Sequence, residues 1–425
     1  MPRRRARAGA AWRIAALRLL LVVGSACAGL GLAELGVRWW RWHTLGAIPV
    51  PGYPDALTVH DPRYHHRYKP RTTVRESRPD FEAVYTTNAL GLRGSRDYGP
   101  KPPGTIRLLM LGDSFTFGIG VNEGEPFCDL LQAAVAGSRP PVEIINAGVG
   151  SYSPTLEYLT LRDLYLAWDP DAVILWFDFS DLQDDELYAR RLRYDPAGVL
   201  VGCDSDYADG HRDWAEMVLR RSALATYLHS KLVRSVQRIR LLGWRAYLDA
   251  KLRGEDTKLK AVFATGPPRL RMNLLQYDRY LMIRGLATEQ ELDRYWVRTG
   301  GFLLKIQELL EARGIPFVLG LYPQAVQVGP DHWANGREYY LFERGRTYDD
   351  PLPFTYIERF AAAHGIPVIN TLPSFLAASD RPLFLPNDGH FTPEGHRALA
   401  AHALNDPVFR RLLRPRGRLS ESDKP

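Results

Sequence analysis

The chain has 425 residues, of which 45% are hydrophobic and 24% are charged, and its formal net charge is +7. This composition is that of an ordinary globular protein, and the length suits one large domain or two smaller ones. Three cysteines exclude a disulfide scaffold and a zinc site of the C-x-x-C type, and the sequence has no internal repeat and no low-complexity tract.

The N-terminus has the pattern of a membrane anchor. Six arginines between Arg3 and Arg18 precede the first acidic residue, Glu34, and the stretch Leu19 to Ala33 is uncharged and mostly apolar. Fifteen helical residues reach about 22 Å, and extension to Ala15 and Val37 reaches the roughly 30 Å of a hydrocarbon core. We expect a single-pass anchor in the inner membrane over residues 1–42, with the basic tail cytoplasmic and the rest periplasmic or extracellular.

Other interpretations of this segment stay open. Ala26-Cys27-Ala28 resembles the cleavage site of a secretory signal peptide, which would leave no anchor on the mature chain. Lipidation of Cys27 and a buried soluble helix are the remaining alternatives. In an exported domain Cys128 and Cys203 could form a disulfide, although two buried thiols are the simpler expectation.

Residues 43–104 are rich in Pro, Tyr, Arg and Thr, and we expect an irregular arm with a few short strands. Beyond it, buried strands are predicted at Ile106–Leu111, Val142–Ile145, Ala172–Phe177, Pro316–Leu321 and Pro367–Ile369. Helical patterns lie between or after them, at Pro126–Ala136, Thr155–Trp168, Arg298–Arg313, Thr355–His364 and from Pro393, behind the N-cap Thr392, to about Ala403.

This alternation predicts the fold class. Strands that alternate with helices form a parallel sheet covered on both faces, and five strands suit a flavodoxin-like three-layer α/β sandwich. We expect this domain to span residues 105–410, followed by a tail at 411–425. Ligands of such sheets bind beyond the carboxyl ends of the strands, so functional residues should directly follow them.

One interval, about residues 190–299, breaks the alternation. Residues 211–260 hold twelve Lys or Arg and five Asp or Glu, and Leu224, Leu228, Leu232, Val236 and Ile239 recur at helical spacing. The interval is predicted to be a basic, amphipathic helical insertion. A solvated lid packed on the core is one interpretation, and contact with anionic lipid headgroups or a polyanionic polymer is the other. Nucleic acid is not an expected partner outside the cell.

The ends of the predicted strands carry the candidate chemistry. Ser114 follows the first strand, at the start of helical sequence, and a serine hydroxyl needs a base to become a nucleophile. Asp388 and His390 stand in "PNDGHFTPEGH", just before the last helix, where His390 could take the proton of Ser114 while Asp388 orients the imidazole. The loops "NAGVGSYS" and "FDFSD" could aim hydrogen-bond donors at a developing oxyanion.

These segments together resemble the SGNH (GDSL-type) hydrolase superfamily. The resemblance covers about residues 84–190 and 300–405, rests on "GDSFTFG", "NAGVGSYS", "FDFSDLQDD" and "NDGHFTPEGH", and leaves out the insertion. It implies that Ser114 is the nucleophile, His390 the base and Asp388 its orienting acid, with no metal or other cofactor. The D-x-H spacing is similar to that of alginate and cell-wall polysaccharide O-acetyltransferases.

The resemblance also implies an oxyanion hole, in which this chain departs from the family. Backbone donors are expected from Ser114 and from Ser151, with Gly150 adjacent, where the family has a glycine. Ser180 stands where the family has an asparagine, and a hydroxyl reaches less far than an amide. His396 is the second candidate base, more consistent with packing, and the acids Asp181, Asp184, Asp185 and Glu186 are interpreted as a solvated helix start and not as a metal site.

We therefore expect an ester hydrolase or O-acyltransferase that acts through an acyl-enzyme on an exported glycan or a small acyl ester. A membrane-bound partner that donates the acyl group is also expected for the transfer reaction. A non-catalytic glycan-binding or assembly protein with a weakened oxyanion hole is one alternative. A lipid-active esterase that uses the basic insertion is the other.

Overall fold

The computed structural model describes residues 2–45, 57–205, 244–252, 279–285, 287–340 and 342–414, together with single positions between 222 and 239. Most of the basic stretch 211–260 and the residues after 414 lie outside this described part. The chain divides into two compact units, Met1–Pro51 with His211–Gln237, and Gly52–Gly210 with Arg238–Pro425. The five predicted strands lie in the second unit.

A five-stranded parallel sheet forms the centre of this unit and confirms the predicted fold class. Its strands lie in the order β11-β10-β7-β5-β6, with the bounds β5 Ile106–Gly112, β6 Val142–Asn146, β7 Ala172–Phe177, β10 Phe317–Leu321 and β11 Val368–Asn370. Every residue of β5, β6, β7 and β10 is buried, as in sheets covered on both faces. Numbered along the chain, this is the flavodoxin-like order 2-1-3-4-5, whose switch point lies between β5 and β7.

Helices cover the two faces of the sheet. Right-handed crossovers place α3 and the C-terminal α16 on one face of the sheet and α4, α5 and α12 on the other. The contacts between helices agree with this, because α3 packs against α16, and α12 packs against α4 and α5. The helices of this unit are α2 Ser114–Phe117, α3 Phe127–Ala134, α4 Pro154–Asp163, η1 Tyr165–Trp168, α5 Asp181–Tyr188, η2 Ala189–Arg191, α8 Trp244–Leu252, α11 Leu281–Arg284, α12 Glu289–Glu311, α13 Ala325–Val328, η3 Arg337–Tyr340, α14 Leu352–Ala363, α15 Leu372–Ala377, α16 Pro393–Asn405 and α17 Pro407–Leu412.

Several boundaries differ from the prediction for local reasons. The helix predicted from Arg298 begins at Glu289, because Thr288 and Glu291 form a reciprocal capping box there. The insertion, predicted to lack buried strands, opens with the antiparallel pair β8 Leu192–Tyr194 and β9 Leu200–Cys203. The predicted cap of the last helix is confirmed, since the Thr392 hydroxyl accepts the Gly395 N–H at 3.2 Å.

The arm is more ordered than its composition suggested. It folds into two antiparallel hairpins, β1 Thr58–Asp61 with β2 His65–Tyr68, and β3 Thr73–Arg78 with β4 Phe81–Thr86. Tyr68 and Tyr85 pack against Phe117 in a second apolar cluster, next to the first turn after β5. The arm is therefore placed beside the ligand-binding edge of the sheet.

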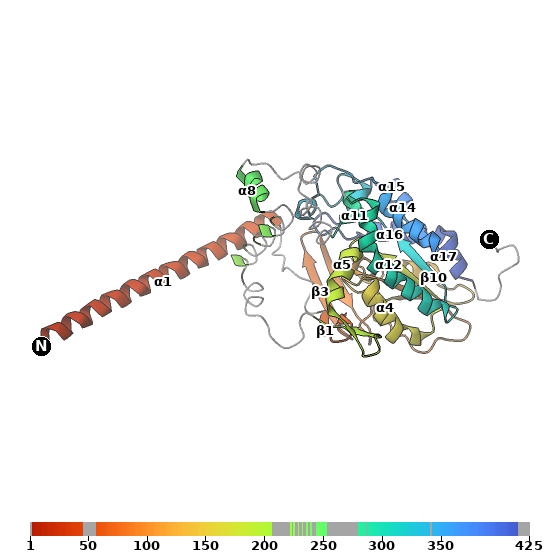
Figure 1. Cartoon of the computed structure of the whole chain (residues 1–425), viewed down its shortest axis with the longest axis horizontal. Helices are drawn as coiled ribbons and strands as arrows, with labels where there is room; N and C mark the ends of the chain where they lie inside the picture. Colours follow the sequence, from red (N-terminus) through yellow and green to blue (C-terminus); the bar gives the residue numbers. More distant parts are fainter. Residues whose placement is uncertain are drawn as a thin grey trace. The chain divides into compact units, whose positions relative to one another are not determined.

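The described part of the other unit includes one long helix. Helix α1, Pro2–Leu45, is continuous (red in Figure 1), and its stretch Arg18–Trp39 has 22 residues of mean hydropathy 1.9, none of which is buried. By length and composition this stretch could cross a membrane or serve as a signal sequence.

Candidate active site

Ser114 stands at the carboxyl end of β5, as predicted. It is the first residue of α2 and is only 4% exposed. The turn requires Gly112, whose φ of +151° is unfavourable for other residues and whose place for a Cβ lies 2.1 Å from Oγ1 of Thr116. Asp113 caps the turn, because its Oδ1 accepts the Phe115 N–H at 2.8 Å. Backbone geometry thus fixes the direction of the serine.

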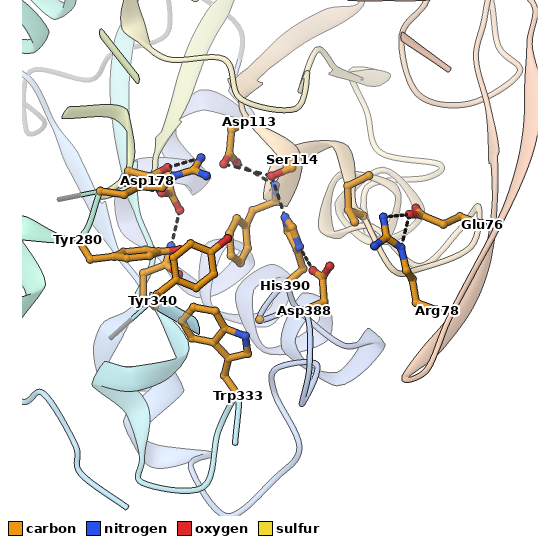
Figure 2. Close-up of a pocket in the computed structure, with 16 residues that line it drawn as sticks. Glu76, Arg78, Asp113, Ser114, Asp178, Tyr280, Trp333, Tyr340, Asp388 and His390 are labelled. Atoms are coloured by element: carbon orange, nitrogen blue, oxygen red, sulfur yellow. Dashed lines mark hydrogen bonds and ion pairs between the residues drawn. The ribbon is translucent and has the colours of Figure 1, made fainter. Parts of the chain in front are cut away.

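His390 and Asp388 meet this serine from the loop before α16. The Nε2 atom of His390 lies 2.8 Å from Oγ of Ser114, and its Nδ1 contacts Oδ1 of Asp388. Since a carboxylate can only accept, Nδ1 carries the ring proton and Nε2 presents the lone pair to the Ser114 hydroxyl. Figure 2 shows the imidazole ring between the serine and the carboxylate. The structure therefore brings together the three residues predicted to form the triad.

The electrostatics of the pair suit a base. Burial lowers the pKa of His390, but the charge of Asp388 and its hydrogen bond raise that pKa more, so the net shift is upward from 6.5. Burial likewise raises the pKa of Asp388, yet the contact with His390 lowers it below its ordinary value. The arrangement stabilises the imidazolium that forms when His390 takes a proton.

Two carboxylic acids, Asp113 and Asp178, lie close together at the switch point of the sheet. The Tyr322 hydroxyl oxygen is 3.2 Å from Oδ1 of Asp113 and 3.1 Å from Oδ2 of Asp178. Burial, and then the charge of Asp178, raise the pKa of Asp113 to about 7. One hydroxyl proton cannot serve two carboxylates, so the contact is satisfied when one acid keeps its own proton. Asp113 is the acid that the raised pKa indicates.

The triad residues, together with Asp113 and Asp178, line a pocket of about 280 Å³. In Figure 2 three aromatic side chains, Tyr280, Tyr340 and Trp333, lie together to the left of and below the triad, and the pair Glu76 and Arg78 lies to its right. The complete lining consists of Glu76, Arg78, Asp113, Ser114, Phe115, Ile119, Asp178, Ser180, Arg279, Tyr280, Gln324, Trp333, Tyr340, Asp388, Gly389 and His390. A concave site with an aromatic wall and a few convergent polar groups is typical of a small-molecule site.

The predicted oxyanion donors are only partly assembled. Ser114 and Ser180 line the pocket, but Gly150 and Ser151 do not. The Gly150 N–H donates instead to the Tyr68 hydroxyl at 2.8 Å, and the Ser151 carbonyl accepts from the Tyr188 hydroxyl at 2.7 Å. The hairpin β1–β2 and helix α5 thus hold this loop. The Gly150 N–H is therefore engaged by the arm, whereas the contribution of the Ser151 N–H to an oxyanion hole stays a prediction.

Ser180 has a neighbour that sequence patterns did not indicate. Arg279 Nη2 donates to Oγ of Ser180 at 3.2 Å and to Oδ2 of Asp184 at 3.0 Å. A hydroxyl that accepts from a guanidinium still has its own proton to donate, and the cation polarises that proton. The guanidinium and the hydroxyl therefore stand together where the family resemblance implies an asparagine.

The remaining candidates have structural roles. His396 is buried and its Nδ1 accepts the Phe127 N–H at 3.2 Å, as expected for a packing residue. Cys128 and Cys203 are separate buried thiols. The acids that open α5 are not solvated, because Asp181, Asp184 and Asp185 are at most 7% exposed, and burial raises their pKa values. Within the described residues no group of His, Cys, Asp and Glu is arranged to hold a metal.

Several lining residues escaped the sequence analysis. Glu76 and Arg78 come from the arm, Arg279 and Tyr280 from the end of the insertion, and Trp333 and Tyr340 from the segment between β10 and α14. None of them directly follows a strand of the central sheet, and none belongs to a periodic pattern. Only their aromatic and charged character could have drawn attention to them.

Comparisons with known proteins find distant structural likeness. No protein-family model matches the sequence, and no curated protein matches it. Similar solved structures include the acetyl xylan esterase AlAXEase (14% identity, TM-score 0.35, 71% of this chain and 98% of that chain). They also include a lipolytic protein of the G-D-S-L family from Veillonella parvula (12% identity, TM-score 0.33, 71% of this chain and 98% of that chain). A third is a putative acylhydrolase from Bacteroides fragilis (13% identity, TM-score 0.33, 75% of this chain and 93% of that chain). The chemistry of the site is derived below from this chain's own residues.

Proposed function

We propose that this protein is a serine-dependent acyl ester hydrolase or O-acyltransferase that acts through an acyl-enzyme. The observation that carries the proposal is the line from Ser114 through His390 to Asp388, with 2.8 Å between the serine oxygen and the imidazole nitrogen. A nucleophile next to a base that a third group orients is the arrangement required for acyl transfer.

The residues account for each proton of the reaction. Ser114 Oγ attacks the ester carbonyl while Nε2 of His390 takes its proton, and the Ser114 N–H and the Ser180 hydroxyl, polarised by Arg279, face the oxyanion. The intermediate then collapses, and the imidazolium gives its proton to the leaving alcohol, which leaves an acyl group on Ser114. Water or a sugar hydroxyl next loses a proton to His390 as it attacks the acyl carbonyl. The imidazolium returns this proton to Oγ of Ser114 when the second intermediate collapses, which releases the acyl product and restores the serine.

The pocket lining supports a sugar-containing substrate. The rings of Tyr280, Trp333 and Tyr340 contact one another, with centroid distances of 5.1 to 6.2 Å, and Arg279 and Gln324 add hydrogen-bond donors beside them. Apolar ring surfaces suit the C–H face of a sugar, and amide and guanidinium groups suit its hydroxyls. An acylated glycan of the cell envelope is therefore the proposed substrate class, with a membrane-bound acyl donor as partner in the transfer reaction.

The proposed location rests on the apolar stretch of α1. We propose that Arg18–Trp39 anchors the chain in the inner membrane, with the arginine-rich end in the cytoplasm and the domain with the sheet in the periplasm or outside the cell. Within the span Glu34 and Arg38 form an i,i+4 ion pair at 2.7 Å, which lowers the cost of placing both charges near the headgroups.

A serine-directed fluorophosphonate probe tests the nucleophile. Full-length wild type and Ser95→Ala, which alters an exposed serine bonded to Glu123, should each take up one probe per chain, and Ser114→Ala should take up none. Equal labelling of Ser114→Ala would refute the assignment. Failure of the wild type to react would favour the non-catalytic, glycan-binding function. Mass spectrometry of surface glycans from Ser114→Ala and wild-type cells then identifies the acyl group.

A lipid-active esterase is the second candidate, and α8 is the observation that favours it. Trp244, Leu248 and Leu252 are 46 to 79% exposed and recur every fourth residue, with Arg245 and Lys251 beside them, as in helices that lie on an anionic membrane surface. Deletion of residues 211–260 should then reduce hydrolysis of vesicle-borne esters but spare soluble aryl esters. An equal effect on both substrates would remove this candidate.

A further inference from the structure

The hairpin β3–β4 reaches the loop that carries the acid of the triad. Its tip is the two-residue turn Pro79–Asp80, and Oδ2 of Asp80 accepts the backbone N–H groups of Asn387 at 2.8 Å and Asp388 at 3.2 Å. More than 300 residues separate these partners along the chain, and Asp80 is half-buried at the contact. One carboxylate oxygen thus binds two consecutive amides of the catalytic loop.

The other end of the hairpin is fixed to the loop that follows the nucleophile. The Tyr85 hydroxyl accepts the Gly120 N–H at 3.0 Å, and Oδ1 of Asn122 accepts the Val84 N–H at 3.0 Å. Tyr85 has no exposed surface and packs on Phe117, the last residue of α2. The hairpin therefore connects the Ser114 side of the site with the Asp388 side.

The catalytic loop has a second support opposite this one. Trp333 Nε1 donates to the Asn387 carbonyl at 3.2 Å, and its indole lies where a Cβ on Gly389 would stand, 2.8 Å from Cε2. The backbone of Asn387 is thus held through its N–H by Asp80 and through its carbonyl by Trp333. Of these two supports, only Trp333 lines the pocket.

We propose that Asp80 is a positioning residue for the triad and that the β3–β4 hairpin braces the site. Asp80 binds the backbone N–H of Asp388 and so fixes the angle at which the Asp388 carboxylate meets Nδ1 of His390. This inference rests on the proposed function, because the brace has a catalytic consequence only if Ser114 is acylated. Without Asp80 two amides lose their acceptor and the loop is free to shift, and a displacement of about 1 Å can cost roughly 100-fold in rate.

Three variants of the full-length chain test the proposal. Asp80→Ala removes the acceptor, Asp80→Asn keeps one carbonyl oxygen in its place, and Glu82→Ala is the control, because Glu82 lies on the same hairpin in an exposed pair with Arg75. The measurements are the rate of fluorophosphonate reaction per active chain, kcat and KM for p-nitrophenyl acetate, the pH profile of kcat/KM and the unfolding midpoint in urea.

We expect Asp80→Ala to lower kcat and the labelling rate about 10- to 100-fold with little change in KM, and Asp80→Asn to restore most of the loss. A looser contact with Asp388 lowers the pKa of His390, so the acidic limb of kcat/KM should move to lower pH. A purely structural role would reduce the fraction of active chains but leave the rate per active chain and the pH profile unchanged. That result, or full activity of Asp80→Ala, would overturn the proposal, whereas a wild type that does not react with the probe would instead overturn the proposed function.

Discussion

The Nε2 atom of His390 lies 2.8 Å from Oγ of Ser114, although the two residues are 276 positions apart in the chain. Ser114 begins α2 directly after β5, and His390 comes after the last strand, so the parallel sheet brings both to its carboxyl edge. Such an approach of hydroxyl to imidazole is the geometry that a general base requires. The expected outcomes below follow from this contact and from the groups around it.

Removal of the negative charge of Asp388 should reduce turnover more than binding. In Asp388→Asn the side-chain amide can donate to Nδ1, which favours the tautomer with the proton on Nε2 and leaves Ser114 without a base. We expect kcat for an aryl acetate to fall by about 10³- to 10⁴-fold with a smaller change in KM. Steady-state kinetics measure this, and a loss below tenfold would mean that Asp388 does not orient His390.

The activity should rise with pH. His390 must be neutral to accept the proton of Ser114, and its pKa is raised above 6.5 by the contact with Asp388. The midpoint of kcat/KM on the acid side should therefore lie above 6.5 in the wild type and move down when Asp388 is neutralised. A pH–rate profile from pH 5 to 9 measures the midpoint, and an unchanged midpoint in Asp388→Asn would contradict the pairing.

The same pair sets a window of stability. The raised pKa of His390 stabilises the fold fully below 6.5, and that contribution is lost as the pH rises through the raised value. The lowered pKa of Asp388 stabilises the fold above 3.8, and that contribution is lost as the pH falls through the lowered value. The contribution of the pair to the free energy of unfolding should thus be largest between pH 3.8 and 6.5, and urea titrations of wild type and His390→Ala across this range test it.

Ionisation of Asp113 should destabilise the fold as the pH rises from about 4 to about 7. Burial first and Asp178 second raise its pKa from 3.8 to about 7, so its contribution to stability is present below pH 3.8 and is lost as the pH rises to about 7. Asp113→Asn does not ionise and should gain about 1–4 kcal/mol of unfolding free energy relative to wild type between pH 4 and 8. The exposed Asp380→Asn is the control, and an equal gain in both variants would refute the buried ionisation.

Gly389 should not tolerate a side chain. Its φ is +89°, and a Cβ there would lie 2.8 Å from the indole of Trp333. Gly198 has a similar φ of +79° but open space around it, so Gly198→Ala isolates the backbone strain. We expect Gly198→Ala to lose about 1 kcal/mol of stability, and Gly389→Ala to lose about 1–3 kcal/mol more and to slow fluorophosphonate labelling. Equal losses would mean that the contact with Trp333 is readily relieved.

The pair of Ser180 and Arg279 should serve as the missing oxyanion donor. Loss of one such donor commonly lowers kcat by about 10²- to 10³-fold, and we expect a loss near the lower value for Arg279→Ala. Ser180→Asn in the Arg279→Ala background should restore part of the activity, because an amide donates without help from a cation. Kinetics of the two single variants and the double variant test this, and the absence of any rescue would place the oxyanion elsewhere.

Alternation of apolar runs with helical patterns was sufficient to predict the parallel sheet, because strands buried on both faces are mostly apolar, and the buried Arg107 of β5 and Glu143 of β6 form an ion pair with each other. It was also sufficient to indicate Ser114, Asp388 and His390, since each follows a strand or precedes the last helix. The loop of Gly150 and Ser151 shows where this reasoning ends. Its Gly150 N–H donates to Tyr68, because a hairpin far earlier in the chain supplies a hydroxyl there.

By itself the sequence determined the fold class, the apolar N-terminal helix and the three residues, Ser114, Asp388 and His390, that meet at the sheet edge, because local periodicity and the position after a strand are properties of short segments. Only the tertiary structure decided which walls enclose the triad. Asp80 reaches the loop of Asp388, and Arg279 reaches Ser180, from segments with no periodic signal of their own. Such contacts depend on how hairpins and loops pack around the sheet edge, and packing between distant segments leaves no local pattern in a single sequence.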